Sequence, residues 1–239
     1  MTEQECRIIL ALDLDSRVEA LRLAQILRDE VALVKVGLQA FTACGPALIH
    51  DLRRLGVEVF LDLKLHDIPN TVGSAAAQAV RLGCSMLTLH TMGGLQMLRA
   101  AREQVDEAAR KLGRPVPRLL GVTVLTSLDE QQLERIGIPG SPCQLVVHLA
   151  GLALEAGLDG VVSSPRELEL LRQEPLNRLL RVTPGVRASD APKHDQRRTM
   201  TPREAVQAGA DYLVIGRPIT ENTDPLQAAR SVNREIRSC

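Results

Sequence analysis

The sequence predicts a single-domain α/β protein whose eight parallel strands close into a (β/α)8 barrel, the TIM-barrel architecture. Three observations favour this class. Eight short apolar runs recur along the chain, longer segments of helical spacing separate them, and glycines or capping motifs mark the junctions. The length of 239 residues suits one such barrel, so we expect one domain over residues 1–239.

The strand candidates are mostly apolar throughout and contain many β-branched residues. This composition is typical of parallel strands that are covered on both faces, whereas the strands of a sheet with one solvent-exposed face would alternate apolar and polar residues. In chain order the expected strands are 7–12, 33–36, 57–63, 86–90, 119–125, 160–163, 179–183 and 211–215.

The segments between these strands carry helix start and stop signals. A glycine in the left-handed C′ position is expected to end four helices shortly before a strand, at Gly56, Gly83, Gly157 and Gly209. Capping boxes of the form S/T-x-x-E are expected to begin helices at Ser16, Ser127, Ser164 and Thr201. The alternative is an open doubly wound sheet, which is less favoured because no G-x-G-x-x-G follows the first strand.

Composition narrows the possible functions. The 29 basic residues balance 29 acidic ones and aromatic residues make up 1%, so neither charge nor base-stacking platforms favour nucleic-acid binding. The five cysteines are widely spaced and odd in number, which indicates reduced thiols. The N-terminal apolar run 8–12 is too short for a signal peptide, and no segment approaches the roughly 20 apolar residues of a membrane span. We therefore expect a cytoplasmic protein without a membrane partner.

Four charged residues interrupt the apolar strands near their carboxyl ends, where barrels place their active sites: Asp13, Lys35, Asp62 and Lys64. Residues i and i+2 of a strand share a face, so Asp62 and Lys64 should point the same way. Buried ions are costly unless they are paired, and these four charges sum to zero. They predict a reactive Asp/Lys array; the alternatives are a structural ion-pair network or solvated strand ends.

Two glycine/arginine turns follow the last two strands, where barrels most often hold a phosphate group: Gly185 with Arg187, and Gly216 with Arg217. Glycine lets backbone N–H groups approach phosphate oxygens, and a guanidinium can clamp them. The alternative is a pair of solvated surface arginines. The 18-residue segment from 183 to 200 is long for a loop in a compact domain and is expected to be a lid or binding loop.

The run Asp62-Leu-Lys-Leu-His-Asp-Ile-Pro-Asn-Thr71 resembles the signature of the orotidine 5′-monophosphate decarboxylase family. The resemblance extends over nearly the whole chain, through LALD at Asp13, VKVG at Lys35, VTVLTS ending at Ser127, DGVVSSP, TPGVR and VIGRPIT. The related 3-keto-gulonate 6-phosphate decarboxylases share D-x-K-x-x-D and use the acidic residues partly for magnesium. The continuation Ile-Pro-Asn-Thr favours the orotidylate branch.

The resemblance implies decarboxylation of orotidine 5′-monophosphate to uridine 5′-monophosphate in pyrimidine biosynthesis, with no metal and no organic cofactor. Lys64 would protonate C6 of the pyrimidine, and Asp62 would lie beside the departing carboxylate. Lys35 and Asp13 would hold the ribose hydroxyls and orient the array.

The resemblance further implies a homodimer with shared active sites, in which Asp67 and Thr71 come from the neighbouring subunit. Thr126 would contact the pyrimidine, and Ser127 is the alternative for that contact. The phosphate site and its closing loop would consist of Arg187, Gln196, Gly216 and Arg217.

The histidines are interpreted as structural or solvated, although His90 lies on the predicted active rim. Two rival functions remain open. One is a magnesium-dependent sugar-phosphate decarboxylase on the same barrel, and the other is a barrel that binds phosphorylated ligands without turnover.

Overall fold

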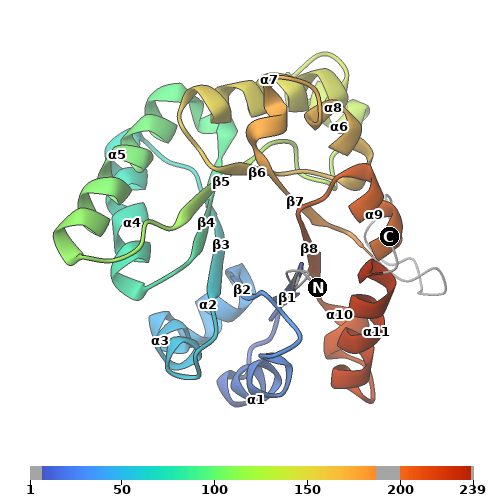
Figure 1. Cartoon of the computed structure of the whole chain (residues 1–239). Helices are drawn as coiled ribbons and strands as arrows, with labels where there is room; N and C mark the ends of the chain where they lie inside the picture. The colour runs from blue at the N-terminus through green and yellow to red at the C-terminus, as the bar shows by residue number, and fades with distance from the viewer. Residues whose placement is uncertain (1–6, 187–199, 238–239) are drawn as a thin grey trace.

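The computed structural model describes residues 7–186 and 200–237, and its centre is a closed barrel of eight parallel strands in sequence order (Figure 1). Pairing of the first strand with the eighth closes the sheet, so the TIM-barrel prediction is confirmed and the open-sheet alternative is wrong. The strands are β1 (Ile8–Ala11), β2 (Leu33–Gly37), β3 (Val59–Leu65), β4 (Met86–His90), β5 (Arg118–Val122), β6 (Gly160–Val162), β7 (Leu180–Pro184) and β8 (Tyr212–Ile215).

All eight expected strands are present, and the differences lie at their ends. β5 ends at Val122, three residues before the expected end, and β3 continues to Leu65, two residues beyond it. The extension of β3 follows from an irregularity. Leu61 pairs with Leu87 and Leu65 with Leu89, so β3 advances by four residues between these two pairs while β4 advances by two. A sequence pattern of period two does not reveal such a bulge.

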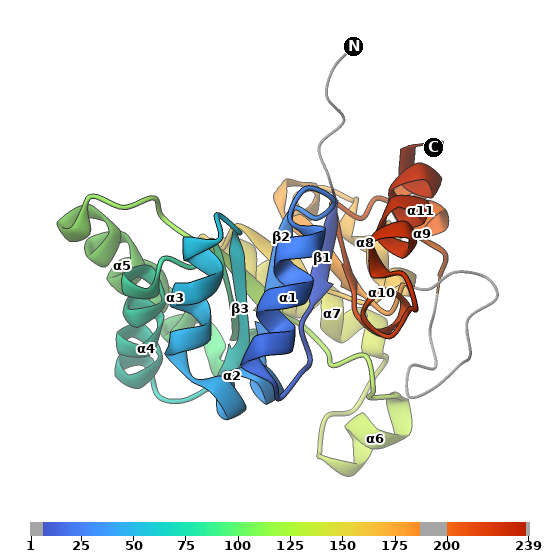
Figure 2. The same ribbon diagram turned by 90° about the horizontal axis from the view of Figure 1, so that it is seen from below.

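Helices surround the barrel, and α6 projects beyond one end of it (Figure 2). The α-helices are α1 (Arg17–Leu27), α2 (Leu38–Cys44), α3 (Pro46–Arg54), α4 (Pro69–Leu82), α5 (Gly94–Leu112), α6 (Glu130–Arg135), α7 (Pro142–Glu155), α8 (Leu168–Leu171), α9 (Pro202–Ala208), α10 (Arg217–Thr220) and α11 (Pro225–Arg237). Short 3-10 turns are η1 (Thr91–Gly93), η2 (Pro165–Glu167) and η3 (Leu176–Arg178). No helix within the described ranges is both long and apolar enough to cross a lipid bilayer.

Most of the expected helix boundaries are confirmed. Gly83 and Gly209 are left-handed C-caps, and Gly56 and Gly157 have positive φ just beyond theirs. At α9 the reciprocal capping box is complete. The Thr201 hydroxyl accepts from the Glu204 N–H at 3.2 Å, and the Glu204 carboxylate accepts from the Thr201 N–H at 2.8 Å.

Two capping predictions need correction. At α1 the Ser16 hydroxyl accepts from the Glu19 N–H, but the Glu19 carboxylate binds Arg22 and does not complete the box. The box expected at Ser127 is wrong, because α6 begins two residues later than predicted. Asp129 is its N-cap and forms a reciprocal box with Gln132. The sequence Ser-Leu-Asp-Glu-Gln-Gln contains two overlapping capping patterns, and the helix begins at the second of them.

Apolar side chains fill the barrel interior, which is therefore a packed core. Ile9, Leu33, Phe60, Met86, Leu120 and Val182 form this inner cluster, and a larger cluster joins the outer face of the sheet to the helices. Because strand side chains alternate, the next inward-facing positions along β2, β3 and β4 are Lys35, Asp62 and Thr88. The inner cluster thus forms a floor beneath a polar layer at the carboxyl ends of the strands.

Candidate active site

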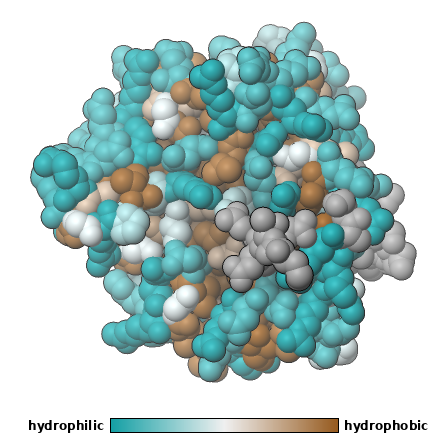
Figure 3. Space-filling model, viewed as in Figure 1, coloured by the Kyte–Doolittle hydropathy of each residue, from teal (hydrophilic) through white to brown (hydrophobic). Residues whose placement is uncertain are grey.

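A cavity of about 290 Å³ lies at the carboxyl ends of the strands, above the apolar floor. On the face shown in Figure 3, apolar side chains are visible around the centre of the barrel and hydrophilic ones cover most of the periphery. Three basic side chains and two carboxylates line the cavity: Lys35, Lys64, Arg217, Asp13 and Asp62. This excess of positive charge suits an anionic ligand.

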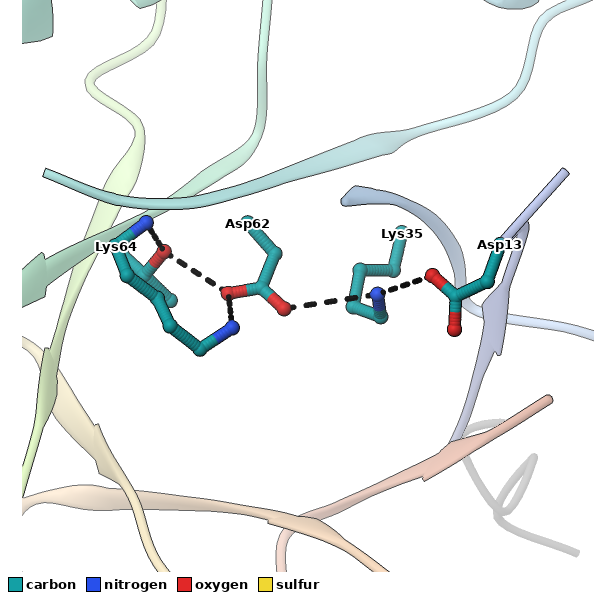
Figure 4. Close-up of polar contacts among 5 residues, drawn as sticks. Asp13, Lys35, Asp62 and Lys64 are labelled. Carbon is teal, nitrogen blue, oxygen red and sulfur yellow. Dashed lines mark hydrogen bonds and ion pairs between the residues drawn. The ribbon is translucent and has the colours of Figure 1, made fainter. Parts of the chain in front are cut away.

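The four predicted charged residues form one continuous array (Figure 4). Lys35 Nζ lies 2.9 Å from Asp13 Oδ1 and 3.6 Å from Asp62 Oδ2, and Lys64 Nζ lies 2.8 Å from Asp62 Oδ1. Asp62 and Lys35 are buried, whereas the Asp13 side chain is 55% exposed. The array thus extends from the interior of the barrel toward solvent, with opposite charges alternating along it.

Asp62 is the electrostatic centre of the array. Burial by itself would raise the pKa of its carboxyl group. The charges of Lys35 and Lys64, with hydrogen bonds from Lys64 and Thr88, outweigh that effect and lower the pKa below its ordinary value. Asp62 is therefore an ionised carboxylate at neutral pH.

Lys64 has an unusual backbone conformation. Its φ of 51° is the only positive φ of a non-glycine residue in the described part of the chain. The residue lies in the β3 bulge between Leu61 and Leu65, where pairing with β4 shifts register. Its N–H donates to Thr88 Oγ1 at 2.9 Å. Left-handed backbone is disfavoured for a residue with a Cβ atom, and in native structures such strain gathers at functional sites.

Two further residues shape the array without having been identified from the sequence. Thr88 donates a hydrogen bond to Asp62 Oδ1 at 3.0 Å, and the only sequence signal was a hydroxyl on the inward face of an apolar strand. Gly37 leaves space for the first ion pair, because a Cβ there would lie 2.8 Å from Lys35 Nζ and 3.1 Å from Asp13 Oδ1. Its φ of −91° is ordinary, so the requirement for glycine here is steric.

The two turns predicted to bind phosphate face the same cavity as the array. Gly185, Gly216 and Arg217 all line it. Gly216 also packs closely on β1, since a Cβ there would lie 3.3 Å from the Cβ of Ala11. The predicted residues Arg187 and Gln196, and most of the expected loop 183–200, lie outside the described residues.

The remaining predicted site residues are placed differently. Thr126 lines the cavity, while Ser127 is exposed and is not among the residues that line it. Asp67 and Thr71 are exposed, and within the described ranges no hydrogen bond or ion pair joins either to the array. The Asp67 carboxylate instead accepts a hydrogen bond from the Ile68 N–H at 2.6 Å.

A pair of stacked histidines lies near Lys64. The rings of His66 and His90 are 5.2 Å apart between centroids, at an interplanar angle of 28°. Burial lowers the pKa of His90, and the charges of His66 and Lys64 lower it further. His90 Nδ1 is buried without a hydrogen-bond partner among the described residues. The predicted structural role of His90 remains compatible with this neutral, stacked ring.

The described residues include no group of three or more His, Cys, Asp or Glu side chains arranged to hold a metal ion. The closed barrel and the charge-paired site at its carboxyl end define the class of this protein as a (β/α)8-barrel enzyme. A family model described as "Orotidine 5'-phosphate decarboxylase / HUMPS family" matches residues 6–232. The chain belongs to this family.

Individual relatives agree with this membership over nearly full length. A protein from Pelobacter propionicus named "Orotidine 5'-phosphate decarboxylase" is 50% identical over 234 residues, which cover 98% of this chain and 96% of the relative. A crystal structure of orotidine 5'-phosphate decarboxylase from Lactobacillus acidophilus superposes with a TM-score of 0.85 at 35% identity, covering 97% of this chain and 99% of that one.

Proposed function

We propose that this protein decarboxylates orotidine 5′-monophosphate to uridine 5′-monophosphate in pyrimidine biosynthesis, as a carboxy-lyase that needs no metal or organic cofactor. The observation that carries the proposal is the Asp13–Lys35–Asp62–Lys64 array, which shares one cavity with the two glycine turns and Arg217. The names of the full-length relatives support the same substrate.

Lys64 would be the proton donor. Breaking the bond between C6 and the carboxylate leaves an electron pair on C6 with little resonance stabilisation. The Lys64 ammonium, already oriented by Asp62 at 2.8 Å, would stabilise this charge and transfer one proton to C6, and solvent would then reprotonate the amine. Carbon dioxide and uridine 5′-monophosphate are the products.

The other members of the site would position the substrate. Asp13 and Lys35 would bind the ribose hydroxyls, Asp62 would lie beside the reacting carboxylate, and Thr126 would contact the pyrimidine. Arg217 and the backbone at Gly216 would bind the phosphate in the same cavity. Binding energy from this remote phosphate could then be used at the reacting carbon.

The proposal includes a homodimer in which Asp67 and Thr71 complete the partner's site. Three observations support it. The exposed Asp67 carboxylate accepts from the Ile68 N–H, with no hydrogen bond or ion pair to its own array among the described residues, and the neighbouring Ile68 is an apolar side chain that is 67% exposed. Met92 is a second exposed apolar side chain, on the turn that follows the stacked His90.

We also propose the cytoplasm as the location, because the described cysteines are free thiols.

Loss of orotidylate absorbance tests the activity directly and should proceed unchanged with a strong chelator present. A chelator-sensitive reaction restored by magnesium, on 3-keto-gulonate 6-phosphate but not on orotidylate, would instead show the sugar-phosphate decarboxylase. Calorimetric binding of orotidylate without turnover would show a non-catalytic barrel. Either of these results would refute the proposal.

A further inference from the structure

Thr88 joins the two halves of the reactive end of β3. Its Oγ1 accepts a hydrogen bond from the Lys64 N–H at 2.9 Å and lies 3.0 Å from Asp62 Oδ1. A hydroxyl has one proton, and an ionised carboxylate can only accept, so the Thr88 O–H must donate to Asp62. The side chain is fully buried, and rotating the hydroxyl away would leave the Lys64 N–H without its acceptor and would remove one of the donors to Asp62.

The bonded groups are the ones whose placement decides where the Lys64 ammonium lies. Asp62 Oδ1 receives the Thr88 hydroxyl and Lys64 Nζ together. The Lys64 N–H belongs to the bulge, where pairing between β3 and β4 is interrupted and the backbone is left-handed. Thr88 therefore holds both the backbone of the lysine and the carboxylate that binds its side chain.

We propose that Thr88 is a positioning residue for the reaction, whose hydroxyl fixes the β3 bulge and the Asp62 carboxylate so that Lys64 Nζ is aimed into the cavity. Thr88 is not among the residues that line this cavity, so its effect is transmitted through Asp62 and Lys64. The inference rests on the proposed decarboxylation, in which Lys64 supplies the proton.

A general contribution to stability would be the simpler role, and Thr91 provides the matched comparison. Thr91 is also fully buried, and its hydroxyl donates to the backbone carbonyl of Val122 at 2.7 Å. It follows the same strand as Thr88, and among the described residues no hydrogen bond joins it to the array. Thr88→Val and Thr91→Val each remove one buried hydroxyl while keeping side-chain volume, so only the loss of positioning distinguishes them.

The Thr88 hydroxyl also contributes to the low pKa of Asp62. The charged and titratable groups around that carboxylate are Lys35 from β2 and Lys64 from β3, with Asp13 beyond Lys35 and the His66–His90 pair near Lys64. All of these remain when the hydroxyl is removed. Thr88→Val should therefore raise the pKa of Asp62 and move the acidic limb of the kcat profile to higher pH.

The test compares wild type, Thr88→Val, Thr88→Ser and Thr91→Val in steady-state orotidylate assays across pH, with thermal unfolding of each. We expect Thr88→Val to lower kcat about 10- to 150-fold, the size of one lost hydrogen bond to a charged group. KM should change little, because the phosphate contacts are intact. Thr88→Ser should restore kcat and the pH profile, and Thr91→Val should lose stability alone.

Wild-type kcat and an unmoved acidic limb in folded Thr88→Val would overturn the inference, as would an equal loss of kcat in Thr91→Val. If Thr88→Val does not fold, Thr88→Ser and Thr88→Cys carry the same comparison, since they differ little in shape but the thiol is a weak hydrogen-bond partner. Equal kcat in that pair would refute positioning. Failure of wild type to decarboxylate orotidylate would refute the proposed function itself, whereas loss of the positioning claim leaves it standing.

Discussion

At the scale of single residues, the site depends on a glycine that supplies space and a lysine that lies in strained backbone. Gly37 has an ordinary φ, so its backbone conformation does not require glycine. Its lack of a side chain matters because a Cβ there would clash with Lys35 Nζ. Lys64 shows the reverse case, a bulky residue in the left-handed region that a glycine would adopt more readily. Gly37 thus leaves space for the ion pair, and Lys64 takes a disfavoured backbone conformation within the charge array.

Gly37→Ala should therefore impair catalysis more than stability. The added Cβ would displace Lys35 Nζ from Asp13, and a misplacement of this kind is expected to lower kcat/KM by about 10- to 100-fold. The displaced atom is the end of a flexible side chain, so the melting temperature should fall only slightly. Steady-state kinetics and thermal unfolding measure the two effects.

Gly151→Ala is the matched control. Gly151 lies within α7, and a Cβ there would have nothing within 4 Å. This variant should be more stable by roughly 0.5 to 1 kcal/mol, because alanine is the better helix former, with unchanged kinetics. Normal kcat/KM in Gly37→Ala would show that the space beside Lys35 is not needed.

Arg217→Ala should discriminate between substrates with and without a phosphate. Losing one charge-assisted contact is expected to reduce kcat/KM for orotidylate by about 10- to 150-fold, while the slow reaction of orotidine changes little. Arg99→Ala removes an exposed arginine paired with Glu155 and should affect neither substrate. Equal losses on both substrates in Arg217→Ala would mean that Arg217 does not bind the phosphate.

At the scale of elements, overlapping capping motifs in the sequence do not show at which residue a helix begins. α6 begins after Asp129 although Ser127 begins an equally good S-x-x-E pattern. β3 likewise continues through a bulge that its apolar pattern does not show. The sequence predicts that an element is present more securely than it predicts the residue where the element begins.

The start of α6 yields a prediction with an internal control. Asp129→Ala removes the carboxylate that accepts from the Gln132 N–H and should cost about 0.5 to 2 kcal/mol of helix stability. Ser127→Ala should cost less, since its hydroxyl caps no helix here. Amide hydrogen exchange within residues 130–135 reports the local effect. A greater loss of protection in Ser127→Ala than in Asp129→Ala would show that Ser127, and not Asp129, is the N-cap of this helix.

At the scale of the whole molecule, the proposed shared site can be tested by mixing two inactive variants, Lys64→Ala and Asp67→Ala. If the site is shared as proposed, each homodimer lacks a needed residue in both of its sites and is inactive. In a mixed dimer, one site contains both substitutions and the other combines native Lys64 with the partner's native Asp67. After random exchange from an equal mixture, activity should recover to about one quarter of wild type.

The mixing experiment requires joint unfolding and refolding if subunits exchange slowly, and each variant treated alone must remain inactive. Mixed dimers can be counted by native mass spectrometry when one variant is isotopically labelled. Mixed dimers without activity would place Asp67 in its own subunit's site.

The barrel, its eight strands and the four members of the charge array can all be predicted from the sequence alone. The apolar pattern of the strands and the helix start and stop signals are local properties of the sequence. In a parallel barrel the carboxyl ends of all strands meet at one face, so Asp13, Lys35, Asp62 and Lys64 are expected to converge there. The two glycine turns reached the same cavity for the same reason.

Only the tertiary structure revealed how that array is held. The bulge at Lys64, the bridging hydroxyl of Thr88 and the space left by Gly37 each depend on an atom of a neighbouring strand or loop. Register between strands and the room around an ion pair are set by packing between segments distant in sequence. Periodicity along one strand therefore identifies which residues face the site, whereas packing between strands determines the orientation of their side chains.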